Sequence, residues 1–173
     1  MSRLLTLIAV VAMLFPFVPA QQPATPPADV AVVEAESGQL IGTRVDTVRP
    51  GYSGDGYVSG FEDDGSGVAV TISVPAKGLY VLTITYAADE EKTNDIFVNG
   101  LGVGSMVFPP SDDFTAIDAG KVWMEAGDNT VEIRKNWGYF DVDAFRVAPA
   151  PPRAPLAADD TLSTPTPRQR HRR

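Results

Sequence analysis

The stretch that decides the fold is VAVTISV at residues 68–74, followed by YVLTITY at residues 80–86. In both runs apolar side chains alternate with small or polar ones, and residues two apart on a β-strand lie on the same face. Between the runs, PAKG at residues 75–78 is typical of a turn. These residues predict two β-strands that each direct one face into a core.

Turn signals recur at short intervals toward the C-terminus. Asn99-Gly100 follows IFV at residues 96–98, and this dipeptide is strongly favoured in two-residue hairpins. GDN at residues 127–129 leads into another strand-like run at residues 130–134. No segment after the first twenty residues shows a sustained helical period. The sequence therefore predicts an all-β fold, an antiparallel β-sandwich of the jelly-roll type that forms one domain.

Composition sets the limits of this domain. A chain of 173 residues that is 44% hydrophobic suits one ordinary domain with flanking segments. Residues 21–28 are rich in Pro and Ala and predict a linker, which leaves residues 29–148 as the β-sandwich. Residues 149–173 are Pro-rich and end in a basic cluster, so we expect a disordered tail there.

Residues 1–20 predict a cleaved secretory signal peptide. They contain Arg3, an apolar run from Leu4 to Val18, and small residues before a cleavage point after Ala20. The alternative is a transmembrane anchor, but prolines interrupt the run, which is shorter than the roughly 20 residues that a bilayer span needs. We therefore expect a secreted, extracellular protein with no membrane span in the mature chain.

Charge and cysteine content narrow the classes of partner and chemistry. Residues 29–150 contain 20 acidic and 8 basic residues, which argues against nucleic acid as a partner and favours cations and neutral ligands. The chain has no Cys, so an exported domain must be stabilised by its core or by a bound ion. The only His, His171, lies in the tail, and no nucleophile motif is present. We expect a monomer without thiol or imidazole chemistry.

Three carboxylates suggest a metal site. Glu34 and Glu36 lie two apart in the first expected strand and would point from the same face. Asp143 has the parity of the apolar residues of the last strand, which places it at the rim of the core. Such oxygen ligands suit Ca²⁺, which takes roughly 6 to 8 of them. The alternative is that the glutamates lie on a solvated edge while Asp143 caps a turn or pairs with Arg146 or Arg44.

Loop aromatics with polar neighbours are candidates for binding sugars, because aromatic rings stack on sugar C–H faces while amides and carboxylates bind hydroxyls. Tyr52 lies in RPGYSGDGY at residues 49–57, and Trp137 lies in KNWGY at residues 135–139. Phe114, after the segment PPSDD, is a third candidate. For each of these aromatics, packing over the end of the sandwich is the alternative.

Other aromatic residues are explained at least as well by the core. This applies to Tyr57, Tyr139 and Phe140. Trp123 lies within an expected strand, where an aromatic residue is more often part of the core than a platform for a ligand.

The order of five segments resembles carbohydrate-binding modules of families 6 and 35, with family 35 the closer match. The resemblance covers essentially the whole expected domain. The segments are VEAE (33–36), GYSGDGYV (51–58), VPAKGLY (74–80), FVNG (97–100) and NWGYFDVD (136–143).

The resemblance implies a β-jelly-roll with a structural calcium ion held by Glu34, Glu36 and Asp143. It implies a ligand site in loops at one end of the sandwich. There, Tyr52 and Trp137 would be aromatic surfaces and Asn136 a hydrogen-bonding amide, with Phe114 where related modules often have a tryptophan or another loop residue. Such modules bind plant cell-wall mannans, xylans, galactosides or uronic acids without catalysing a reaction.

Two other functions remain open from the residues. One is a small glycosidase or lyase that uses paired carboxylates such as Asp141 and Asp143. The other is a secreted adhesion or structural domain that lacks sugar binding and uses the basic tail to attach to an acidic surface. A binder is retarded in a polysaccharide gel without releasing reducing sugar, whereas an enzyme releases product.

Overall fold

The computed structural model describes residues 31–151. The expected signal peptide and linker therefore lie outside the described residues, as does nearly all of the expected tail. Within residues 31–151 the chain forms eleven β-strands and a single turn of 3₁₀-helix, η1 (Ala35–Ser37). No helix in this part of the chain is long and apolar enough to cross a membrane.

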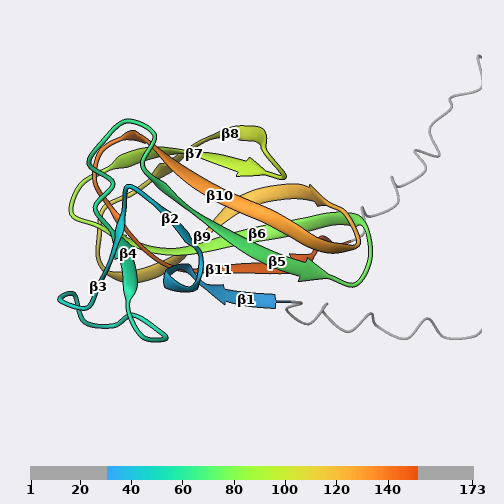
Figure 1. Ribbon diagram of the computed structural model, residues 1–173, viewed down its shortest axis with the longest axis horizontal. Coiled ribbons are helices and arrows are strands. Elements are labelled where there is room, and N and C mark those ends of the chain that lie inside the picture. The colour runs from blue at the N-terminus through green and yellow to red at the C-terminus, as the bar shows by residue number, and fades with distance from the viewer. Residues whose placement is uncertain (1–30, 152–173) are drawn as a thin grey trace, which may run out of the picture.

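The strands form two antiparallel sheets packed face to face, which confirms the predicted all-β sandwich (Figure 1). In the six-stranded sheet the order is β3-β4-β11-β6-β9, and β1 pairs with β11. Its strands are β1 (Ala31–Glu34), β3 (Arg44–Asp46), β4 (Tyr57–Ser59), β6 (Gly78–Ala88), β9 (Ser111–Met124) and β11 (Asp141–Pro149).

The five-stranded sheet has the order β2-β5-β10-β7-β8. Its strands are β2 (Gln39–Ile41), β5 (Gly67–Val74), β7 (Lys92–Val98), β8 (Leu101–Phe108) and β10 (Gly127–Trp137). β8 is an edge of this sheet, as β9 is an edge of the other, so each sheet ends in a strand with one unpaired side.

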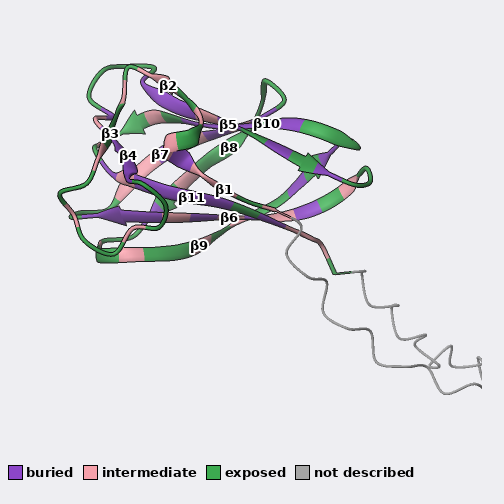
Figure 2. Ribbon diagram, turned by 60° about the horizontal axis from the view of Figure 1, so that its bottom comes forward, coloured by how far each residue is buried: buried purple, intermediate pink, exposed green. Residues whose placement is uncertain are grey.

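The two runs with a period of two behave as predicted. Val68, Val70, Ile72 and Val74 of β5 are buried, and so are Tyr80, Leu82, Ile84 and Tyr86 of β6. The two strands belong to different sheets, so their apolar faces meet across the sandwich. Full burial of one such aliphatic side chain is worth about 1.5–3 kcal/mol, so this alternation accounts for much of the core. Figure 2 shows buried residues concentrated on the strands and exposed residues in the loops.

The predicted hairpin at Asn99-Gly100 joins β7 to β8. Val98 pairs with Leu101, and both loop residues have positive φ, 52° at Asn99 and 78° at Gly100. A two-residue loop of this type matches the right-handed twist of its strands, which explains why Asn-Gly is favoured here.

Trp123 differs from its expected place in the core. Its neighbours Val122 and Met124 are buried, whereas Trp123 is 55% exposed. Its indole N–H donates to Glu125 Oε1 at 2.9 Å. Because successive side chains of a strand point to opposite faces, burial of both neighbours places Trp123 on the outer surface.

Most of the long loops lie at one end of the sandwich. Residues 47–56, 60–66, 89–91 and 138–140 connect strands there, opposite the end at which residues 31 and 151 lie (Figure 1). β11 extends to Pro149, and the N–H of Ala150 donates to the carbonyl of Leu79 at 2.9 Å. The sandwich thus extends slightly beyond the predicted boundary at residue 148.

Candidate functional site

A pocket of about 330 Å³ opens at the loop end of the sandwich, where β10 ends. It is lined by Asp64, Glu90, Lys92, Lys135, Asn136, Trp137, Gly138 and Tyr139. Trp137 is 71% exposed and Tyr139 is 61% exposed, so two aromatic rings and several polar groups face solvent around one hollow. Two of the four predicted ligand residues, Asn136 and Trp137, lie here.

A β-bulge presents Asn136 and Trp137 to this pocket. In the pairing of β10 with β7, Lys135 faces Asn94 but Trp137 faces Thr93, so Asn136 is the extra residue. A bulge redirects the side chains that follow it, and bulges are common next to functional sites. The N–H of Asn136 donates to Asn94 Oδ1 at 3.2 Å, and its side-chain amide donates to Asp95 Oδ1 at 3.0 Å. The amide is thereby held in one orientation.

Two lysines form the polar wall of the pocket. The side chains of Lys92 and Lys135 are only 12% and 15% exposed. Lys92 Nζ donates to Glu90 Oε2 at 3.2 Å, and Lys135 Nζ donates to the carbonyl of Glu62 at 2.8 Å. Gly138 has φ of 88°, a left-handed conformation that favours glycine in the turn after Trp137, and a Cβ there would also lie 2.4 Å from the Lys92 side chain.

The other two predicted ligand residues, Tyr52 and Phe114, pack in a separate aromatic cluster. Their rings lie 5.8 Å and 5.1 Å from the ring of Tyr57, which is 3% exposed. Both are half-buried and neither lines the Trp137 pocket. The four predicted residues are therefore at the same end of the molecule but divide into two groups.

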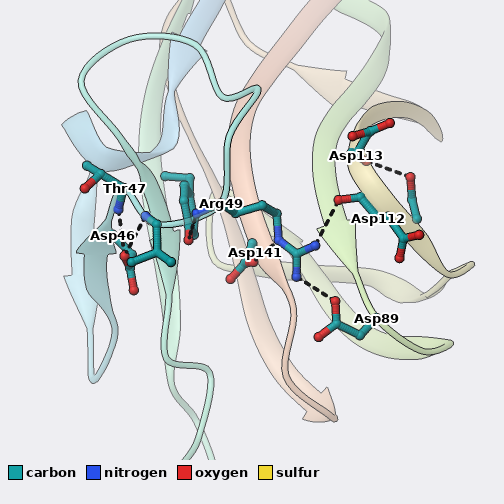
Figure 3. Close-up of polar contacts among 10 residues, drawn as sticks. Asp46, Thr47, Arg49, Asp89, Asp112, Asp113 and Asp141 are labelled. Carbon is teal, nitrogen blue, oxygen red and sulfur yellow. Dashed lines mark hydrogen bonds and ion pairs between the residues drawn. The ribbon is translucent and has the colours of Figure 1, made fainter.

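The Arg49 side chain points toward Asp89, Asp112 and Asp141, which come from separate segments of the chain (Figure 3). Its Nε donates to Asp141 Oδ2 at 2.8 Å, Nη2 to Asp89 Oδ1 at 2.7 Å and Nη1 to the carbonyl of Asp112 at 2.9 Å. Its backbone N–H donates to the hydroxyl of Tyr57 at 3.0 Å. Burial raises the pKa of Asp141, and the Arg49 guanidinium offsets part of this rise. Sequence reasoning missed this role, because these partners are 40 to 92 residues away and no local pattern links them.

The three carboxylates predicted to bind calcium converge on the loop that contains Ser53. The Ser53 hydroxyl lies 2.8 Å from Glu34 Oε2 and 2.9 Å from Asp143 Oδ2, and the Ser53 N–H donates to Asp143 Oδ1 at 2.9 Å. The N–H of Asp55 donates to Glu36 Oε1 at 2.9 Å. β1 pairs with β11, and this pairing of the first and last strands brings Glu34 close to Asp143.

The reason for this convergence differs from the expected one. Glu36 lies in η1 rather than in the first strand, so strand parity does not align it with Glu34. Asp143 is 3% exposed and occupies a bulge in the pairing of β11 with β6. The alternative partner Arg44 instead pairs with Glu62 at 3.0 Å.

The cluster formed by Glu34, Glu36 and Asp143 has more negative charge than its surroundings balance. Burial raises the pKa of Asp143, the nearby Glu36 carboxylate adds to this rise, and hydrogen bonds from Ser53 offset part of it. Glu36 Oε2 is buried and has no hydrogen-bond partner within residues 31–151. The donor set is suited to a hard cation. As the side chains lie, however, no set of three or more Asp, Glu, His or Cys side chains among the described residues is already arranged around one metal position.

The family comparison agrees with this architecture. Residues 31–150 match the model of carbohydrate binding module family 35, and the chain belongs to that family. Modules of this family are non-catalytic carbohydrate-binding domains. The predicted resemblance is therefore confirmed.

The chain is similar to parts of several enzymes. It is 41% identical to mannan endo-1,4-beta-mannosidase A of Piromyces sp., over 68% of this chain and 20% of that protein. It is 35% identical to mannan endo-1,4-beta-mannosidase of Thermothelomyces thermophilus, over 86% of this chain and 30% of that protein. The chain thus spans only 20% to 30% of the length of these relatives.

Solved structures agree with the fold. The Podospora anserina GH26-CBM35 beta-(1,4)-mannanase aligns with a TM-score of 0.68 at 40% identity, over 72% of this chain and 28% of that one. The CBM35 from Paenibacillus barcinonensis aligns with a TM-score of 0.65 at 26% identity, over 69% of this chain and 99% of that one. The second alignment covers nearly the whole of that solved module.

Proposed function

We propose that this protein binds β-1,4-linked mannan without cleaving it, in the pocket beside Trp137. The observation that carries the proposal is an indole ring that is 71% exposed at the rim of a pocket with lysine, carboxylate and amide groups. The choice of mannan rests on the similarity to mannan-degrading enzymes of which the chain matches only a part.

The chemistry of the pocket suits a neutral sugar. An indole ring stacks on the C–H face of a pyranose, and that contact buries apolar area without requiring charge on the ligand. Asn136, Glu90 and Lys92 supply hydrogen-bond donors and acceptors for the hydroxyl groups. Because Lys92 is ion-paired with Glu90 and Lys135 with Asp64, the wall has charges of both signs rather than a single-sign field.

A binding role is also favoured by the state of the two carboxylates considered for catalysis. Asp141 accepts a hydrogen bond from Arg49, and Asp143 accepts two from Ser53. A glycosidase needs one carboxyl as acid and one as base or nucleophile, both facing the substrate. Here the two side chains are held by different partners, and neither lines the Trp137 pocket.

The test compares the two tryptophans of the chain by affinity electrophoresis in gels that contain galactomannan or glucomannan. We expect Trp137→Ala to abolish retardation. The matched control is Trp123→Ala, which removes an exposed tryptophan from the outer face of β9 and should be retarded like the parent protein. Retardation of Trp137→Ala like the parent would contradict the proposed site, and release of reducing sugar would indicate an enzyme. Absence of retardation of the parent in any polysaccharide gel would favour the adhesion hypothesis.

We further propose that Glu34, Glu36 and Asp143 hold a structural Ca²⁺ ion. The support is the convergence of three carboxylates and the buried, unpartnered Glu36 Oε2. Bound calcium would offset most of this negative charge and connect the first and last strands of the sandwich. Because a ligand that binds only the folded state adds about 2.7 kcal/mol at 100 times its Kd, calcium should raise the melting temperature and chelator should lower it.

The matched variants for the calcium test are Glu36→Gln and Glu62→Gln. Glu36→Gln should remove the response of the melting temperature to calcium. Glu62→Gln removes an exposed glutamate whose side chain is 59% accessible and should leave the response intact. A parent protein whose melting temperature is the same in calcium and in chelator would contradict this proposal.

We propose an extracellular location on the strength of residues 1–20. Expression of the full chain in a secreting host, followed by mass spectrometry of the exported protein, should give an N-terminus near residue 21. Recovery of the uncleaved chain in the membrane fraction would favour the anchor instead.

A further inference from the structure

A second hollow lies on the outer face of the five-stranded sheet, along β7 and its edge neighbour β8. It has a volume of about 200 Å³ and is lined by Asp95, Ile96, Phe97, Gly102, Gly104 and Ser105. The residues that line it come from β7 and β8, which are joined by the Asn99-Gly100 hairpin. Figure 1 shows these two strands along the edge of the sheet. We refer to this hollow as the β7–β8 groove.

The groove is open because β8 has glycine at two positions beside β7, Gly102 opposite Phe97 and Gly104 opposite Ile96. A Cβ at Gly102 would lie 3.5 Å from the Phe97 ring, an ordinary contact, and a Cβ at Gly104 would have nothing within 4 Å. The Arg134 guanidinium lies 4.3 Å from the centre of the Phe97 ring and covers one of its faces. The groove therefore combines the Phe97 ring, which Arg134 holds from one face, with the Asp95 carboxylate and open space above two glycines.

A hydrogen bond links the groove to the Trp137 pocket. The side-chain amide of Asn136, which lines the pocket, donates to Asp95 Oδ1, which lines the groove. Ser105 also donates to Asp95 Oδ1, and these hydrogen bonds lower the pKa of Asp95, so the carboxylate stays an acceptor at neutral pH. Hydrogen bonds through Asp95 thus connect lining residues of the two hollows.

The length of this path exceeds a single sugar ring. Trp137 faces Thr93 across the strands, and Gly102 faces Phe97 on the other side of β7. Thr93 and Phe97 are four residues apart, which corresponds to about 13 Å along a strand. A ligand that reaches from Trp137 to Phe97 must therefore contain several linked units.

We propose that the β7–β8 groove is a further sugar subsite, so that a mannan chain is bound along its length from Trp137 to Phe97 rather than at its end alone. This inference rests on the proposed binding of mannan at Trp137. Phe97 would contact a sugar ring, and Asp95 and Ser105 would form hydrogen bonds with its hydroxyl groups.

The test is calorimetric titration of the full chain with mannobiose, mannotetraose and mannohexaose, for the parent and for Gly102→Gln. Gly102 lies outside the left-handed region, so a side chain can be introduced there without backbone strain and would fill the groove. The control is Thr71→Gln, which adds the same side chain at an exposed position of β5, on the same face of the sheet. Equal melting temperatures establish that the variants are folded.

We expect the affinity of the parent to rise roughly tenfold or more from mannobiose to mannohexaose, and Gly102→Gln to abolish this rise without weakening mannobiose binding. Thr71→Gln should behave like the parent. A second variant, Phe97→Ser, should likewise lose the advantage of the longer ligand, and it replaces Gly102→Gln as the test if that variant does not fold.

Two results would overturn the subsite while leaving the proposed function intact. One is a parent affinity that does not rise with chain length, and the other is Gly102→Gln binding mannohexaose as tightly as the parent. Equal weakening of mannobiose and mannohexaose by Gly102→Gln would also contradict a separate subsite. Failure of the parent to bind any of the three oligosaccharides, together with no effect of Trp137→Ala in gels, would instead refute the proposed function and the subsite with it.

Discussion

Arg49 donates hydrogen bonds from all three of its guanidinium nitrogens, to Asp141, Asp89 and the carbonyl of Asp112. The side chains of Arg49 and Asp141 are 22% and 17% exposed. A partly buried charge pair is costly to break, because the remaining partner is left desolvated. This residue therefore ties together loops that border both the Trp137 pocket and the Tyr52 cluster.

Arg49→Met should destabilise the protein by roughly 2–4 kcal/mol, since it leaves the Asp141 carboxylate buried without its cation. The measurement is urea unfolding at neutral pH. The control is Arg44→Met, which breaks an ion pair whose side chains are 60% and 59% exposed. Exposed pairs contribute little, so this variant should stay within about 0.5 kcal/mol of the parent. If Arg49→Met lowers the free energy of unfolding as little as Arg44→Met does, the Arg49 network is not structurally important.

At the scale of elements, the loop between β3 and β4 packs directly on the carboxylate cluster. Gly54 has φ of 64°, and a Cβ there would lie 2.4 Å from Glu36 Oε1 and 3.1 Å from Glu34 Cγ. The loop can approach both glutamates only because residue 54 has no side chain.

Gly54→Ala should therefore cost more than the left-handed backbone penalty of about 1–2 kcal/mol, because displacement of the glutamates adds to it. The matched control is Gly65→Ala, where φ is 82° and a Cβ would have nothing within 4 Å. Chemical denaturation of both variants separates the two contributions. Equal destabilisation would mean that the glutamates move aside without cost.

For the molecule as a whole, the last strand holds the two ends of the domain together. β11 pairs with β1 and with β6, and the N–H of Ala150 donates to the carbonyl of Leu79. A fragment that ends at Pro151 should have the melting temperature of the full chain. A fragment that ends at Ala148 should be less stable by about 1 kcal/mol, because it loses this hydrogen bond. Equal stability of the two fragments would place the functional end of the domain at residue 148.

Much of the fold was predictable from local patterns. The alternation in residues 68–74 and 80–86 identified buried strands, and Asn99-Gly100 identified a hairpin, because each signal depends on residues close in sequence. The same alternation did not determine which face of the strand was inward at Trp123. That choice depended on which neighbours the sandwich buried.

The candidate site was predictable only in part, for the same reason. The sequence by itself determined an all-β domain, its acidic character, and a set of aromatic and carboxylate residues in the loops. Only the tertiary structure decided that Trp137 is exposed beside Lys92 and Glu90, whereas Tyr52 packs against Tyr57. It also decided that Asn136 reaches Asp95 and so joins the pocket to the β7–β8 groove. These contacts join residues far apart in the chain, and their geometry arises from strand pairing and a bulge that no local pattern specifies.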